Sequence, residues 1–181
     1  IMNLDEVTGI SVMRIAEKLD AGPTMLKKEI KLSNEMNAED VSNQLSKIGS
    51  EIISDCLDLI ETSKAKFVEQ DHSKATYAKK INKEEAKISW DEDAIKIIAK
   101  INGLYPNPGV WFLFQGERYK ILKATLSDLK GQPGSVLDGN LTIACGDKSI
   151  KIQEIQRQGK SKQKTTEFLL GSKIKKDLTL S

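Results

Sequence analysis

The sequence predicts a mixed α/β region followed by a mostly β domain built as a small barrel. Three observations lead to this fold class: two extended runs and a long amphipathic helix in the first third, a polar stretch without periodicity after them, and four or five short apolar runs toward the C-terminal end. Short strands at this spacing are typical of small barrels. We therefore divide the chain into a first region at 1–64, a linker at 65–85 and a second region at 86–181.

The pattern of the first region predicts strand, turn, strand and helix. Residues 10–16 alternate apolar and polar side chains, as a half-buried strand does, and 25–32 form a second extended run. Gly22 and Pro23 favour a turn between them. Asn37 is placed to cap a helix that runs to about residue 63. The apolar positions of that helix recur every three or four residues, at Val41, Leu45, Ile48, Ile52, Cys56, Leu59 and Ile60.

The linker and the second region contain short elements. Asn82 and Glu85 have the spacing of a capping box, and Asp91 is placed to cap a second helix that would end at Gly103. The apolar face of this helix would be Ile95, Ile98 and Ile101. Extended runs follow at 110–114, 119–126, 136–137, 141–144 and 150–155, separated by glycine-containing turns.

Composition excludes several classes of protein. The 181 residues are 39% hydrophobic and 30% charged, and no apolar run approaches the roughly 18 to 20 residues of a membrane helix, so we expect no membrane partner. Cys56 and Cys145 are expected to be buried, unpaired thiols of a reducing compartment. His72 is the only histidine. We therefore expect no metal site, and the sequence has no phosphate-binding, dinucleotide-binding or zinc motif.

Two features could carry chemistry. Asp20 lies on the turn between the two predicted strands, where it is either a turn former or a carboxylate aimed into a cleft. A basic segment supplies Arg157, Lys160, Lys162 and Lys164, and residues 146–181 hold nine Lys or Arg against four Asp or Glu. Such a segment either follows a phosphate backbone or forms a solvated loop. The neighbouring barrel favours nucleic acid, by analogy of fold.

Four segments resemble a known family. They are T-G-I-S-V-M-R-I-A-E-K-L-D-A-G-P at 8–23, T-Y-A-K-K-I-N-K-E-E-A-K-I-S-W at 76–90, P-N-P-G at 106–109 with Trp111, and the run from I-Q-R-Q-G-K to F-L-L-G at 155–171. In order and spacing they resemble the methionyl-tRNA formyltransferase family over nearly the whole chain. The linker segment is the most specific, because the wider superfamily shares the L-D-x-G loop but not this linker and barrel.

The resemblance implies a fold and a reaction. The first region would be an α/β remnant of a Rossmann-like formyltransferase domain, and the second an OB-like barrel with short helices that binds tRNA. The reaction would transfer a formyl group from 10-formyltetrahydrofolate to the amino group of methionyl initiator tRNA. Asp20 matches the catalytic Asp, and Ala16, Glu17 and Lys18 match the loop that lines the folate pocket, although Lys18 stands where the family usually has Gly. The catalytic Asn and His of the family have no counterpart here, so we expect an N-terminally truncated form that is inactive alone.

The resemblance also implies the partners. Initiator methionyl-tRNA would be bound through phosphate contacts by the basic residues of the linker and of the second region, and the protein would be a cytoplasmic monomer without a metal. These residues are Lys79, Lys80, Lys83, Arg157, Lys160, Lys162 and Lys164. Two alternatives remain open: a non-catalytic RNA-binding module in which Asp20 only forms a turn, and a related formyltransferase that acts on a small amine or a nucleotide sugar.

Overall fold

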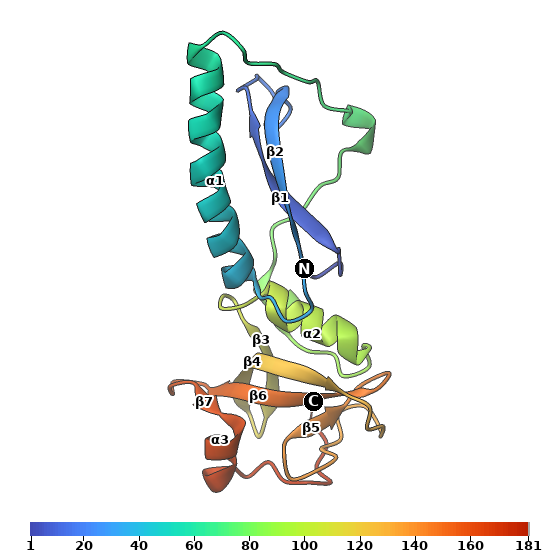
Figure 1. The fold of residues 1–181 in the computed structure, drawn as a ribbon. Helices are drawn as coiled ribbons and strands as arrows, with labels where there is room; N and C mark the ends of the chain where they lie inside the picture. Colours follow the sequence, from blue (N-terminus) through green and yellow to red (C-terminus); the bar gives the residue numbers. More distant parts are fainter. Residues whose placement is uncertain (181) are drawn as a thin grey trace. The chain divides into compact units, whose positions relative to one another are not determined.

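The computed structural model describes residues 1–180, which fall into two units (Figure 1). The hairpin unit comprises residues 5–33 and 40–80, and the sheet unit comprises residues 1–4, 34–39 and 81 onward. A unit boundary thus falls at residues 80 and 81, inside the segment that the sequence predicts to be a linker.

The hairpin unit contains two antiparallel strands and one long helix. Strand β1 (Val7–Met13) pairs with β2 (Thr24–Lys31), and α1 spans Ala38–Glu61. Gly49 lets the helix approach the hairpin, because a Cβ at this position would lie 2.8 Å from Cδ1 of Ile10. The predicted order of strand, turn, strand and helix is confirmed. Strand β1 begins and ends three residues earlier than predicted, and Arg14 instead donates its backbone N–H to the carbonyl of Pro23 at 2.9 Å.

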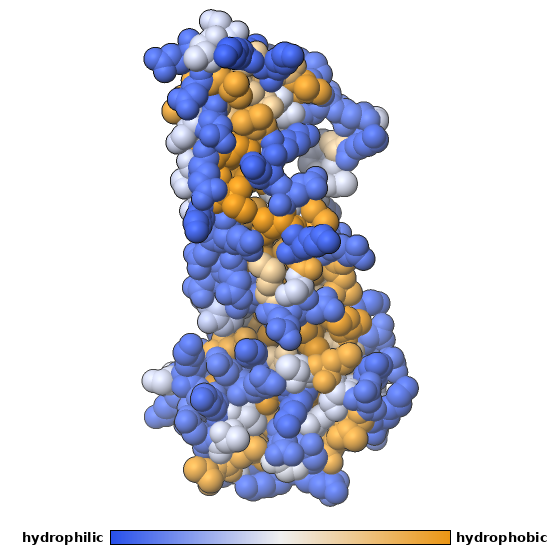
Figure 2. Space-filling view, viewed as in Figure 1, coloured by the Kyte–Doolittle hydropathy of each residue, from blue (hydrophilic) through white to orange (hydrophobic). Residues whose placement is uncertain are grey.

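Only part of the predicted apolar face of α1 is buried. Val41, Ile52 and Cys56 are buried, whereas Ile60, which the sequence places on the same face, is 53% exposed. Burial raises the pKa of the Cys56 thiol. Leu57 is 59% exposed, and Figure 2 shows hydrophobic side chains at the surface over the helix and hairpin. The prediction for Ile60 was wrong because periodicity identifies an apolar face but not what covers it.

The segment between the helix and the sheet unit is mostly irregular. Val68 forms an isolated bridge with Thr24, and a short helical turn η1 covers His72–Lys74. A second turn, η2 (Lys83–Ala86), begins after Asn82. The Asn82 backbone N–H donates to Oε1 of Glu85 at 2.9 Å, which confirms the predicted capping box.

The sheet unit is mostly β, as predicted. Helix α2 (Ala94–Gly103) begins after Asp93 rather than after Asp91, and it buries Ile98 and Ile101 while leaving Ile95 half-buried. The strands are β3 (Val110–Phe114), β4 (Glu117–Ser127), β5 (Thr142–Ala144), β6 (Ser149–Arg157) and β7 (Gln163–Lys164), followed by α3 (Thr165–Gly171). The run at 136–137 forms one isolated bridge, from Val136 to Ile143, instead of a strand.

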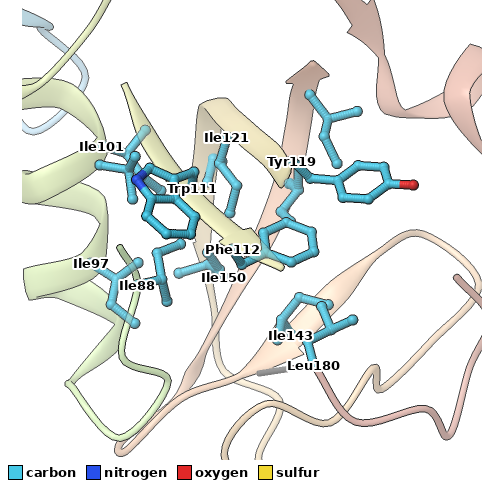
Figure 3. Close-up of a cluster of buried hydrophobic side chains, with 14 of the residues drawn as sticks. Ile88, Ile97, Ile101, Trp111, Phe112, Tyr119, Ile121, Ile143, Ile150 and Leu180 are labelled. Carbon is cyan, nitrogen blue, oxygen red and sulfur yellow. The ribbon is translucent and has the colours of Figure 1, made fainter. Parts of the chain in front are cut away.

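The sheet is antiparallel and curled. Its order is β3-β4-β6-β5, and β7 pairs with β6 beyond β5 along the same edge. Side chains of α2 and the sheet belong to one core, in which Ile97 and Ile101 lie on the Trp111 side of β3 and Phe112 lies on the Tyr119 side (Figure 3). Cys145 lies in this core, and burial raises its pKa to about 12. Both cysteines are buried and unpaired, as predicted.

A tight turn before β5 depends on Asp138. Its Oδ1 accepts the backbone N–H groups of Asn140 at 2.9 Å and Thr142 at 3.1 Å, and its Oδ2 accepts the Thr142 hydroxyl at 2.9 Å. Partial burial alone would raise the pKa of the carboxyl, but these donors outweigh it and lower the pKa below its usual value.

We expect Asp138→Ala to lower the free energy of unfolding of the sheet unit by about 2 kcal/mol at neutral pH, because three hydrogen bonds to a charged acceptor are lost. The lowered pKa means that this stabilisation is present above about pH 4, the unfolded carboxyl's pKa, and is lost as the pH falls through the folded value. Urea unfolding followed by tryptophan fluorescence measures it, since Trp90 and Trp111 both lie in the sheet unit. A difference from wild type that stayed constant down to about pH 2 would contradict the assignment.

Candidate functional site

The loop between β1 and β2 carries the predicted catalytic and cofactor-binding residues. Gly22 is required by close packing, because a Cβ there would lie 1.8 Å from the carbonyl oxygen of Arg14. No other residue type fits at this point without moving the backbone. The two strand ends therefore meet directly beneath the loop.

A distant side chain fixes the far side of this loop. The Gln70 Nε2 donates to the carbonyl of Asp20 at 2.8 Å and to that of Gly22 at 2.7 Å. Nearby, Thr24 and Val68 exchange two backbone hydrogen bonds of 2.8 Å. The Arg14 guanidinium lies 4.0 Å from the centroid of the Phe67 ring. The segment 67–70 thus holds the base of the loop from one side.

Asp20 is held in an unusual backbone conformation with its side chain exposed. Its φ is +54°, a region that Asp and Asn enter more readily than most residues. The carboxylate makes no hydrogen bond or ion pair with any of residues 1–180. Its backbone is therefore fixed by Gln70, while its side chain is available to another group.

The predicted folate-loop residues lie beside Asp20. Ala16, Glu17 and Lys18 are exposed and belong to no helix or strand. Lys18 accepts a backbone hydrogen bond of 3.4 Å from Ala21, but the backbone groups of Ala16 and Glu17 have no partner among the described residues. These exposed backbone donors and acceptors are available to hydrogen-bond a ligand at the edge of the loop.

The predicted basic residues fall into separate groups. Lys79 and Lys80 are exposed in the hairpin unit, and Lys83 is exposed at the start of η2 in the sheet unit. Lys160 and Lys162 lie on the exposed connection between β6 and β7, and Lys164 is the last residue of β7.

Arg157, also predicted to contact tRNA, is already paired. Its Nε and Nη2 donate to Oε2 and Oε1 of Glu117 at 2.7 and 2.6 Å, a bidentate contact. The Arg157 hydrogen bond is the main cause of the lowered pKa of Glu117. The Tyr119 hydroxyl also donates to Oε2 of Glu117, at 3.1 Å. Because Glu117 offsets the charge of Arg157, Arg157 should attract a phosphate less strongly than an unpaired cation does.

Sequence reasoning missed two lysines on the outer face of the sheet. Lys123 and Lys151 are exposed in β4 and β6, between buried neighbours. The alternation of buried and exposed residues along these strands was the available signal. The excess of basic residues at 146–181 instead predicted a binding segment near the C-terminal end.

Neither a cluster of metal-ligating side chains nor a membrane-spanning helix is found in the part of the chain that the structure describes. No group of three or more His, Cys, Asp or Glu among residues 1–180 is placed to hold a metal ion. Over the same residues, the helices are too short or too polar to span a membrane.

The geometry can be compared with known proteins. The family model "Formyl transferase, C-terminal domain" matches residues 80–173, so the chain belongs to the formyltransferase family. Within that family it is similar to methionyl-tRNA formyltransferases, which confirms the resemblance of the four segments between residues 8 and 171. The enzyme of that name from Pelagibacter ubique is 53% identical over 175 residues, covering 96% of this chain and 56% of the relative. The chain therefore spans a little over half the length of that relative.

Solved structures give the same fold. HypX from Aquifex aeolicus, in complex with tetrahydrofolic acid, matches with a TM-score of 0.72 at 20% identity, over 97% of this chain and 32% of that chain. A methionyl-tRNA formyltransferase from Clostridium thermocellum matches with a TM-score of 0.57 at 24% identity, over 71% of this chain and 57% of that chain. At these identities the likeness concerns the fold alone.

Proposed function

We propose that this chain is the C-terminal portion of an enzyme that transfers a formyl group from 10-formyltetrahydrofolate to the amino group of methionyl initiator tRNA. The observation that carries the proposal is the 53% identity to a methionyl-tRNA formyltransferase along almost the whole chain. The exposed, unpartnered carboxylate of Asp20 on a loop held by Gln70 supports it, because the sequence resemblance matches Asp20 to the family's catalytic Asp.

On this proposal the chain contains part of a catalytic domain, a linker and a tRNA-binding domain. Residues 1–64 would end the Rossmann-like catalytic domain, 65–85 would link it to the second domain, and 86–181 would be the OB-like tRNA-binding domain. Exposed apolar residues of the hairpin unit, such as Leu19 at 92% and Leu57 at 59%, are consistent with further protein packed against them. On this proposal the protein works in the cytoplasm as a monomer.

The chemistry assigned to these residues is orientation and charge stabilisation. The donor supplies the formyl group, and the edge of the loop at 16–18 would hold its pterin. Attack by the methionyl amine forms the new C–N bond, the bond from the formyl carbon to the donor nitrogen breaks, and the amine proton passes to that nitrogen or to solvent. Asp20 would orient and charge a His from the preceding part of the enzyme, which stabilises the oxyanion that develops on the formyl oxygen.

Formylation assays test this proposal. The segment that precedes the matching region in the Pelagibacter ubique relative is joined to this chain, and formyl-methionyl-tRNA is measured by acid-urea gel. We expect turnover with the joined protein and none above background with the 181-residue chain, which has one of the three catalytic groups. Turnover by the 181-residue chain alone would show that the active site is complete within it.

A substrate panel separates the alternatives. The joined protein is offered a nucleotide-linked amino sugar beside methionyl-tRNA. Activity on the sugar without activity on the tRNA would replace the proposed substrate by a small amine. Binding of tRNA without formylation of either substrate would favour a non-catalytic RNA-binding module.

A further inference from the structure

We propose that the outer face of strands β4, β6 and β7 binds the sugar-phosphate backbone of an RNA strand. The inference rests on the proposed function for the class of partner, and it adds a location that the sequence alone does not identify. The face contains a hollow of about 430 Å³, which we call the lysine groove. Its polar lining includes Lys123, Asn140, Lys151, Gln153, Lys164 and Thr166.

Strand register brings three lysines together from distant parts of the sequence. Lys123 of β4 pairs with Glu154 of β6, and Glu154 pairs on its other side with Lys164 of β7. Lys151 lies three residues before Glu154 on β6. Neighbouring strands are about 4.8 Å apart, so flexible lysine side chains on three strands can converge on one phosphate or on two successive ones.

The three groove lysines are free to bind an anion. Each is exposed, and none forms an ion pair with a described residue. Four other lysines of the sheet unit form ion pairs with described residues, for example Lys130 with Asp147 at 2.9 Å. Glu154 is the single carboxylate that lines the groove, so three cations and one anion leave it with a net charge of +2.

The chemistry of the lining favours the backbone of RNA over its bases. None of the described residues that line the groove is aromatic, so it offers no platform on which a base could stack. Asn140 and Thr166 can donate hydrogen bonds to phosphate or sugar oxygens. Gln153 is held in place by its own hydrogen bond, from Nε2 to the Thr125 hydroxyl at 3.1 Å.

The groove continues across the sheet, which suits a polymer better than a single ion. Lys123 and Gln153 also line a second hollow of about 490 Å³. This hollow extends to Asn34 and to Asn102 of α2, both within the sheet unit. Its lining also includes Glu35 and the apolar side chains of Ile95, Ile98 and Leu126, so the second hollow lengthens the groove without adding positive charge.

Another hollow in the same unit, of about 640 Å³, is a weaker candidate for phosphate. It contains the cations Arg157, Lys160 and Lys173, and the anions Glu117 and Glu167, which leave a net charge of +1. Arg157 is moreover occupied by Glu117. Charge and availability therefore both favour the lysine groove.

Salt-dependent binding tests the inference on the 181-residue chain. Fluorescently labelled initiator tRNA is titrated with wild type and with a groove variant carrying Lys123→Gln, Lys151→Gln and Lys164→Gln. A matched control carries Lys87→Gln, Lys175→Gln and Lys176→Gln, which remove the same charge from exposed, unpaired lysines outside the groove. At about 0.1 M salt we expect the groove variant to bind about 10- to 100-fold more weakly, and the slope of log K against log salt to fall by about 2.

Each outcome of the titration has a defined meaning. Equal weakening in the groove variant and the control would show bulk charge attraction and overturn the groove. Unchanged binding by the groove variant, with wild type binding tRNA, would overturn the groove and leave the proposed function standing. Absence of binding by wild type would overturn both the groove and tRNA binding by this portion of the protein.

Two further measurements test whether the variant is folded and whether a single anion competes with tRNA. Circular dichroism verifies folding, and if the triple variant unfolds, Lys151→Gln alone replaces it, because this change removes one exposed side chain and should weaken binding in the same direction. Inorganic phosphate is added against chloride at equal ionic strength. Selective displacement of tRNA by millimolar phosphate would indicate a discrete anion site and overturn a backbone track.

Discussion

Replacing Asp20 by Asn in the joined enzyme lowers kcat by roughly 1,000-fold on our proposal, with little change in KM for the tRNA. Asn keeps the size and hydrogen-bonding shape of the side chain but removes its charge. It also tolerates the left-handed backbone conformation that Asp20 adopts at φ +54°. The turn is therefore preserved, and the loss measures the charge alone. Steady-state formylation kinetics with tRNA as the varied substrate gives both constants.

Two comparisons make the Asp20 test specific. Glu29→Gln removes a carboxylate from an exposed position of β2 and should leave kcat within about twofold of wild type, since surface substitutions of this kind change little. Full activity of the Asp20→Asn variant would mean that Asp20 only forms the turn. Amide exchange at Ala21, whose N–H donates to the Lys18 carbonyl, would then still report the intact loop.

The sequence identified the local part of this site better than its long-range part. Gly22 and Pro23 predicted the turn, and the turn is there because both act within a few residues of themselves. Gln70, which binds the Asp20 and Gly22 carbonyls, lies 50 residues from Asp20 in an irregular segment. No periodicity or capping rule relates two such positions, so this clamp could be found only in three dimensions.

The basic residues show the same limit. Counting charges drew attention to Arg157, but its value as a free cation depends on Glu117, which lies 40 residues away on the neighbouring strand. The sequence did not single out Lys123 and Lys151, because only the register of β4 against β6 brings them close together. The predicted start of α2 was wrong by only two residues, with Asp93 in place of Asp91 before the helix. Aspartate is a favoured capping residue at either position, so the sequence alone does not choose between them.

Whereas Asp20→Asn changes the charge of the loop, Gly22→Ala changes its backbone and leaves its charges intact. Gly22→Ala places a methyl group 1.8 Å from the Arg14 carbonyl oxygen and 2.9 Å from the Arg14 carbonyl carbon. Both contacts are to backbone, so no side chain can swing aside and the strand ends must separate. The hydrogen bonds from Arg14 to Pro23 and from Gln70 to Gly22 are then strained or lost. We expect local stability of the hairpin unit to fall by about 2 to 4 kcal/mol.

Native-state amide exchange measures this loss where it occurs, because both tryptophans lie in the sheet unit and do not report on the hairpin. Exchange at Arg14 and Val68 should accelerate by roughly 30- to 1,000-fold, which is the equilibrium equivalent of about 2 to 4 kcal/mol. Gly171→Ala is the matched control, since a Cβ there meets no atom within 4 Å. Unchanged exchange in the Gly22→Ala chain would show that the loop can relax around the methyl group. The close packing of Gly22 against Arg14 would then not be what holds Asp20 in place.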